Sequence, residues 1–165
     1  KILQILYNEY MRKISLVCVG NLKEKFWADS FLEYKKRMSK FFDFNLIELP
    51  EARLQKNNSS EIARVIEAEG DKILEKVKGK MVVALAVEGK HMDSVQFAKF
   101  VATNSDLGEI CFVIGGSYGL DNRVKALGKK ISFSALTFPH QLMRVILMEQ
   151  LYRAGTIINN IEYHK

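Results

Sequence analysis

Apolar and polar positions alternate along the chain in blocks, and these blocks predict strands and helices in turn. Residues 14–19 form a short β-rich run that ends at Gly20, as expected of a strand closed by a turn. The following segment, residues 22–42, places large apolar side chains three and four residues apart, at Trp27, Phe31, Tyr34, Met38 and Phe41. This spacing lines one face of a helix, so a strand followed by an amphipathic helix is predicted here.

The same alternation continues to the end of the chain. Further strands are predicted over residues 44–49, 81–87, 109–114 and 131–135, and helices over residues 58–79, 93–103, 122–127 and from Pro139 onward as the first helical residue. Residues 81–87 and 109–114 are almost wholly apolar, which indicates parallel strands buried on both faces. We therefore predict a single α/β domain of about five mainly parallel strands with helices on both faces of the sheet.

Glycines follow three of the predicted strands at the edge where ligands of open α/β sheets bind. They are Gly20, Gly89, and Gly115 with Gly116. The loop GGSYG, residues 115–119, lets backbone approach a ligand closely, but it matches neither the dinucleotide fingerprint nor a phosphate loop. Taken alone, a tight turn and a nucleotide site explain this loop equally well.

The last helix is apolar almost all round from residue 142 to residue 152. His140 with Arg144 and Glu149 with Arg153 project from nearly opposite sides of it. Burial on all sides would leave guanidinium groups without partners, so we expect the second side to pack against another subunit in a homodimer. The hydroxyls that precede this helix, at Ser134 and Thr137, could either cap it or line a site.

The chain ends in Tyr163, His164 and Lys165, which combine a ring for stacking with two potential cations for phosphate. A frayed, solvated tail is the alternative. The net charge of +6 favours an anionic partner without naming one. Besides residues 1–40, the basic excess falls in one short stretch, at Arg123, Lys125, Lys129 and Lys130.

Length and composition limit the class of protein. With 165 residues, 48% of them hydrophobic and 27% charged, the chain fits one globular domain over residues 11–165, and residues 1–10 are expected to be an extension or leader. Apolar runs are too short to cross a membrane, and Cys18 and Cys111 fit buried thiols in a reducing cytoplasm. The histidines are isolated, which argues against a metal site or a hydrolase triad.

Several segments together resemble one known family. The stretches KISLVCVGNLKEKFW, FVIGGSYGL and LTFPHQLMRVILMEQLYRA and the terminal YHK look like the RlmH family of the SPOUT superfamily, and the likeness covers residues 11–165. Two positions depart from the family pattern: Gly155 replaces a bulky aromatic residue, and Ile161 replaces a small or charged one.

The resemblance implies a function and a fold. Members transfer a methyl group from S-adenosylmethionine to N3 of a pseudouridine in 23S ribosomal RNA of the assembled ribosome, as homodimers with a C-terminal trefoil knot and no metal. It places the cofactor at Leu85, Gly115, Phe133, Ser134, Ala135, Leu136, Thr137 and Phe138. Our candidates for the catalytic, RNA-facing side of such a site are His140, Arg144, Arg153, Tyr163 and His164, with the tail of one subunit completing the pocket of the other. A non-catalytic RNA-binding or ribosome-associated factor on the same fold is the main alternative.

Overall fold

The computed structural model of the protein describes residues 11–165, so the expected leader over residues 1–10 lies outside the described part. Strands and helices alternate along it: β1 (Arg12–Val19), α2 (Lys25–Met38), β2 (Phe42–Leu49), α3 (Ser59–Lys76), β3 (Met81–His91), α4 (Ser94–Ser105), β4 (Ile110–Ile114), α5 (Asn122–Ala126), β5 (Lys129–Ser132) and α6 (His140–Ile158). No helix in this part is long and apolar enough to cross a membrane.

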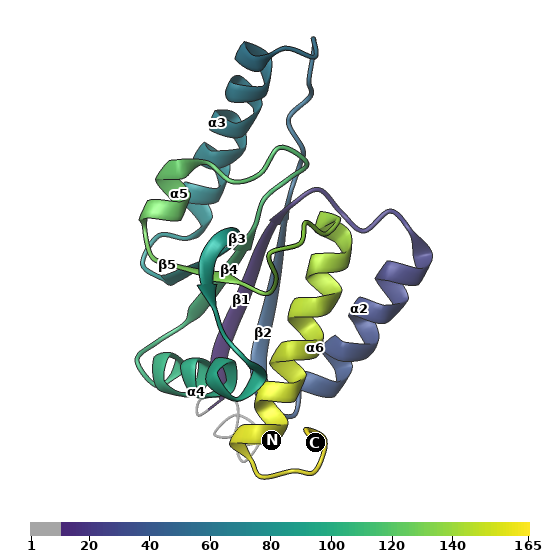
Figure 1. The fold of residues 1–165 in the computed structure, drawn as a ribbon, viewed down its shortest axis with the longest axis vertical. Helices are drawn as coiled ribbons and strands as arrows, with labels where there is room; N and C mark the ends of the chain where they lie inside the picture. The colour runs from purple at the N-terminus through teal and green to yellow at the C-terminus, as the bar shows by residue number, and fades with distance from the viewer. Residues whose placement is uncertain (1–10) are drawn as a thin grey trace, which may run out of the picture.

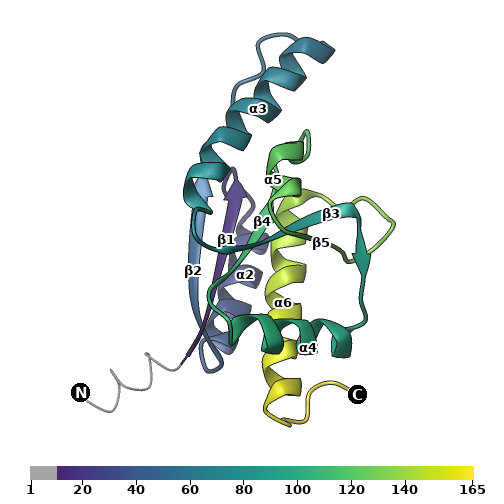
Figure 2. The ribbon, with the colours of Figure 1, turned by 90° about the vertical axis from the view of Figure 1, so that its left-hand side faces the viewer.

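The five strands form one parallel sheet in the order β2-β1-β4-β3-β5, with helices on both faces (Figures 1 and 2). Alternate side chains of β1 enter different cores, since Leu16 and Cys18 face α2, α4 and α6 while Val17 and Val19 face α3 and α5. All of β4 is buried. The α/β fold with parallel strands and helices on both faces is therefore confirmed.

Side chains cap the starts of two of the predicted helices. The side chain of Asn58 accepts the Glu61 N–H at 2.9 Å at the start of α3. Asp93 caps α4 in a reciprocal pair with Gln96. Both thiols, at Cys18 and Cys111, are buried.

The chain leaves β5 earlier than predicted, at Ser132 instead of residue 135. The Ser132 hydroxyl donates to the Ser134 carbonyl at 2.8 Å, and the Leu136 N–H donates to the Ser134 hydroxyl at 3.0 Å, so side chains form a turn where strand pairing was expected. Pro139 is the cap of α6 and His140 its first residue, and no side chain caps this helix. Ser134 therefore serves the turn and not the helix start.

The apolar character of α6 has an explanation within one chain. α2 and α4 pack against it from two sides, and its Leu147, Met148, Leu151 and Ala154 are completely buried (Figure 1). The apolar surface of α6 therefore does not require a second subunit, because α2 and α4 cover the side on which a partner was expected. The homodimer itself stays a prediction, as does the trefoil knot.

Candidate active site

A cleft of about 670 Å³ lies at the carboxyl ends of β4 and β5, beside residues 85–88 of β3. Its other walls come from the glycine loop after β4 and the segment that joins β5 to α6. The lining is mainly aliphatic and aromatic, with a few polar groups, which is the usual make-up of a small-molecule site. Seven of the eight expected cofactor residues line it: Leu85, Gly115, Phe133, Ser134, Leu136, Thr137 and Phe138. Ala135 is exposed beside them and does not line the cleft.

The glycine loop brings bare backbone to the wall of the cleft. A Cβ atom on Gly115 would lie 2.6 Å from the Gly119 carbonyl oxygen, so no side chain fits at position 115. Gly119 has a φ of +91°, which favours glycine, and its N–H donates to the Gly116 carbonyl at 3.1 Å. The loop is thus a tight turn that also presents backbone to a ligand, and the two explanations of its sequence are compatible.

An ion pair at the cleft escaped the sequence analysis. Lys125 lies 2.9 Å from Glu88 and lowers the pKa of that carboxyl group, and both residues line the cleft. Because the partners come from α5 and β3, no spacing in the sequence could have paired them. Within residues 11–165, no three His, Cys, Asp or Glu side chains gather in a way that could hold a metal ion.

His140 lines the cleft from the first turn of α6. Burial lowers its pKa, and the neighbouring Arg144 lowers it further. Its imidazole is therefore predominantly neutral at pH 7, with a nitrogen free to accept a proton. Among the ionisable side chains that line the cleft, Glu88 and Lys125 neutralise each other, so His140 is the one placed for acid–base chemistry.

Arg144 lies beneath the site and is fully buried. Its guanidinium donates to Glu48 Oε1 at 3.0 Å and to the carbonyl oxygens of Val19 at 2.6 Å and Gly20 at 3.0 Å. The expectation that Arg144 faces RNA is therefore wrong for this conformation, since it has no exposed surface to offer. It ties α6 to the ends of β1 and β2, and Glu48 is the partner that sequence reasoning missed.

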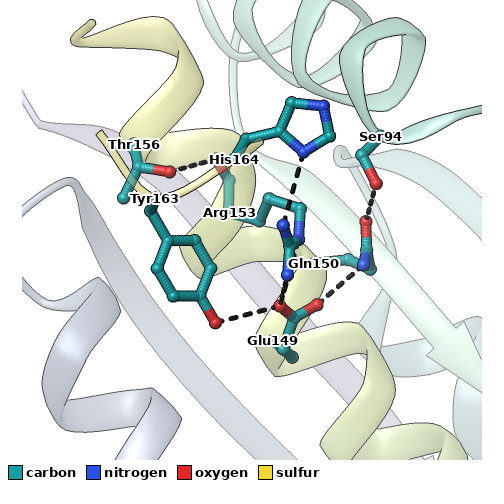
Figure 3. Close-up of polar contacts among 7 residues, drawn as sticks. All are labelled: Ser94, Glu149, Gln150, Arg153, Thr156, Tyr163 and His164. Carbon is teal, nitrogen blue, oxygen red and sulfur yellow. Dashed lines mark hydrogen bonds and ion pairs between the residues drawn. The ribbon is translucent and has the colours of Figure 1, made fainter. Parts of the chain in front are cut away.

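The remaining expected residues lie at the other end of α6. Arg153 donates to Glu149 Oε1 and covers the Tyr163 ring, with 4.7 Å from the guanidinium carbon to the ring centre. The Tyr163 hydroxyl donates to the same Glu149 oxygen at 3.2 Å, and Arg153 Nη1 lies 3.3 Å from His164 Nδ1 (Figure 3). The tail is thus folded onto its own helix. Burial and the Glu149 carboxylate raise the pKa of Tyr163 to about 12, so its hydroxyl stays a donor at pH 7.

Within one chain, the cleft and the tail are separate. Arg153 follows His140 by thirteen positions on α6, and a helix rises 1.5 Å per residue, so about 20 Å of helix separates them. Figure 1 shows α6 beginning beside the strand ends and running to the opposite end of the molecule, where the tail lies. The structure therefore brings His140 to the cofactor candidates but not Arg153, Tyr163 or His164.

Comparison with known proteins shows which class of protein this chain belongs to. Residues 12–164 match a family model described as a predicted SPOUT methyltransferase. A crystal structure of a probable methyltransferase from Bordetella pertussis Tohama I has the same fold, with a TM-score of 0.58 at 15% identity over 92% of this chain and 99% of its own.

Curated relatives narrow this class. The ribosomal RNA large subunit methyltransferase H of Lactobacillus helveticus is 45% identical over 157 residues, 92% of this chain and 99% of the relative. The protein of that name from Streptococcus uberis is 42% identical over 158 residues, 93% of this chain and 99% of the relative. The chain belongs to the SPOUT methyltransferases and, within them, to the family of ribosomal RNA large subunit methyltransferase H, which confirms the resemblance seen in the sequence.

Proposed function

We propose that the protein methylates large-subunit ribosomal RNA, transferring the methyl group of S-adenosylmethionine to N3 of a pseudouridine in 23S RNA of the assembled ribosome. The observation that carries this proposal is the apolar, glycine-lined cleft with the neutral His140 at its wall. Membership of the methyltransferase H family supports ribosomal RNA as the substrate.

The cleft fits the cofactor in size and in chemistry. Its volume of about 670 Å³ lies in the range of pockets that enclose molecules of this size. Aliphatic and aromatic walls at Leu85, Phe133 and Phe138 suit an adenine ring, and the bare backbone at Gly115 suits close approach of polar groups. Bound there, S-adenosylmethionine supplies an activated methyl group on its sulfonium.

The chain then has to align the base, exclude water and remove one proton. N3 of a uracil ring carries a hydrogen that must leave before the methylated product is complete. An imidazole nitrogen of His140 accepts this proton, because desolvation keeps the ring neutral at pH 7. Arg144 holds the first turns of α6 to β1 and β2, and in this way it positions His140 and stays out of contact with RNA.

The position of the tail favours a site shared by two subunits. Arg153, Tyr163 and His164 lie too far from the cleft of their own chain, about 20 Å by helix rise, to act in it. In a homodimer the tail of the partner would approach the cleft and bring an aromatic ring and cations to the RNA. In such a dimer, one chain binds the cofactor in its cleft and the tail of the other chain contacts the RNA.

Methyl transfer from labelled S-adenosylmethionine to assembled ribosomes, separated subunits and naked 23S RNA tests the proposal. We expect label in assembled ribosomes, at N3 of one pseudouridine, and much less in naked RNA. The Gly115→Val variant is the control, because a side chain there meets the Gly119 carbonyl and should abolish cofactor binding. RNA binding without any methyl transfer would contradict the proposal and favour the non-catalytic factor.

A further inference from the structure

A buried carboxyl group, that of Glu69, lies behind the glycine loop and does not line the cleft. Glu69 of α3 is 5% exposed and forms no ion pair within residues 11–165. Its Oε1 atom accepts the Ala52 N–H at 3.0 Å. Its Oε2 atom is buried and accepts no hydrogen bond from the described residues.

This free oxygen faces the loop that lines the cleft. A Cβ atom on Gly116 would lie 2.9 Å from Glu69 Oε2 and 3.2 Å from a methyl carbon of Val19. The carboxyl group therefore occupies the space that a side chain at position 116 would need. Since Gly116 itself lines the cleft, Glu69 supports the wall of the cleft from behind.

The next two residues of α3 lie against the start of α5, just after the glycine loop. Gly70 leaves room for the side chain of Asp121, which caps α5. Asp71 lies 2.9 Å from Arg123, and Arg123 lies 2.6 Å from Asp121. Residues 69–71 of α3 thus lie against Gly116 in the glycine loop and against Asp121 and Arg123 at the start of α5.

The arrangement has an energetic cost. A buried polar atom without a partner is uncommon in folded proteins and destabilises the fold. Burial raises the pKa of Glu69, which favours the neutral acid and lowers this cost without removing it.

We propose that Glu69 is a positioning residue of the cofactor site, which fixes the backbone of Gly116 for S-adenosylmethionine through the contact between its carboxyl group and the loop. The inference rests on the proposed function, because it takes the cleft to be the cofactor site. Glu69 touches neither cofactor nor RNA in this account. Glu69 therefore affects the affinity for the cofactor and leaves the rate of the chemical step unchanged.

A double-mutant cycle between positions 69 and 116 tests this directly. Calorimetry gives the Kd for S-adenosylmethionine of the wild type, Gly116→Ala, Glu69→Ala and the double variant. We expect each single change to weaken binding about tenfold and the double variant to be no weaker than either, because the space vacated at position 69 accepts the new methyl group. With ribosomes as substrate, KM for the cofactor should rise while kcat at saturation stays near the wild-type value.

Two further variants separate positioning from general stability. Glu69→Gln keeps the shape and the acceptor for Ala52, so it should bind within about threefold of wild type, while Glu69→Asp withdraws the carboxyl group and should bind as Glu69→Ala does. If the Glu69→Ala variant does not fold, Glu69→Asp takes its place in the double-mutant cycle. Glu67→Gln, an exposed change on the same helix, is the matched control and should leave Kd unchanged.

The outcomes distinguish this inference from the proposed function. Additive effects at positions 69 and 116, or a wild-type Kd in Glu69→Ala and Glu69→Asp, would overturn the positioning role while leaving the cofactor site in place. A wild-type chain that does not bind S-adenosylmethionine would overturn the proposed function and this inference with it.

Discussion

The histidine at position 140 shows how one side chain obtains its chemistry from its surroundings. Its pKa lies below the ordinary value of 6.5 because the ring is partly desolvated and lies near Arg144. The neutral form accepts a proton, so kcat/KM should rise with pH, pass its midpoint below pH 6.5 and then level off. His140→Asn should lose about 10²-fold or more in kcat together with this acid limb.

The control for this pH profile is His91→Asn, which changes an exposed histidine that does not line the cleft. It should keep both the rate and the acid limb. An unchanged pH profile in His140→Asn would show that another group accepts the proton.

The glycine at position 155 is explained by its neighbour. A Cβ atom there would lie 2.6 Å from Cγ of Phe41, whose ring occupies the space that a side chain at position 155 would need. Gly155→Phe should therefore destabilise the fold by about 1–3 kcal/mol through overpacking. Combining it with Phe41→Ala should recover much of this loss, as measured by denaturant unfolding. Strictly additive changes in the free energy of unfolding would show that the side chains at positions 41 and 155 do not compete for the same space.

At the scale of elements, the two ends of α6 serve different parts of the proposed site. The first turn carries His140 to the cleft, and the last turns hold the tail through Glu149, which binds Arg153 and Tyr163 (Figure 3). Glu149→Ala should release the tail and lower methyl transfer about tenfold, since charge-assisted hydrogen bonds are lost. Cofactor affinity should not change. Glu162→Ala, an exposed change in the tail, is the matched control, and equal activity of the two variants would exclude this role for Glu149.

The sequence could predict what depends on local spacing. Periodicity located the strands and helices and predicted helices on both faces of the sheet. It could not supply the strand order, nor the pairing of Arg144 with Glu48 across 96 positions. The apolar surface of α6 looked like an interface because periodicity shows that a face is buried but not which element covers it.

Over the whole molecule, the basic residues that stand out along the chain are not all free to bind RNA, because Arg123 and Lys125 form ion pairs. Arg123 pairs with Asp71 and Asp121, and Lys125 pairs with Glu88, so reversing these charges would break internal contacts and would not probe RNA binding cleanly. Lys90 of β3 and Lys130 of β5 are exposed. They lie next to Ile131 of the cleft wall, since Lys90 pairs with Ile131 and Lys130 precedes it.

The double variant Lys90→Glu with Lys130→Glu should weaken RNA binding and lower the slope of log K against log salt by about 2, one for each lost phosphate contact. Cofactor affinity should be preserved. Lys36→Glu with Lys78→Glu makes the same change of charge at exposed positions on α2 and after α3, and its salt slope should match that of wild type. Equal slopes in both double variants would place the RNA surface elsewhere.

The central claim is that a cleft from one chain and a tail from another form each site. Deletion of residues 163–165 removes the tail, and Gly115→Val removes the cofactor loop, so either homogeneous protein should show little methyl transfer. After subunit exchange, a mixture of the two should regain activity toward ribosomes, because one site of each mixed dimer has an intact loop and an intact partner tail. Full activity of the deletion variant by itself, or a wild-type chain that is active as a monomer in light scattering, would contradict the account.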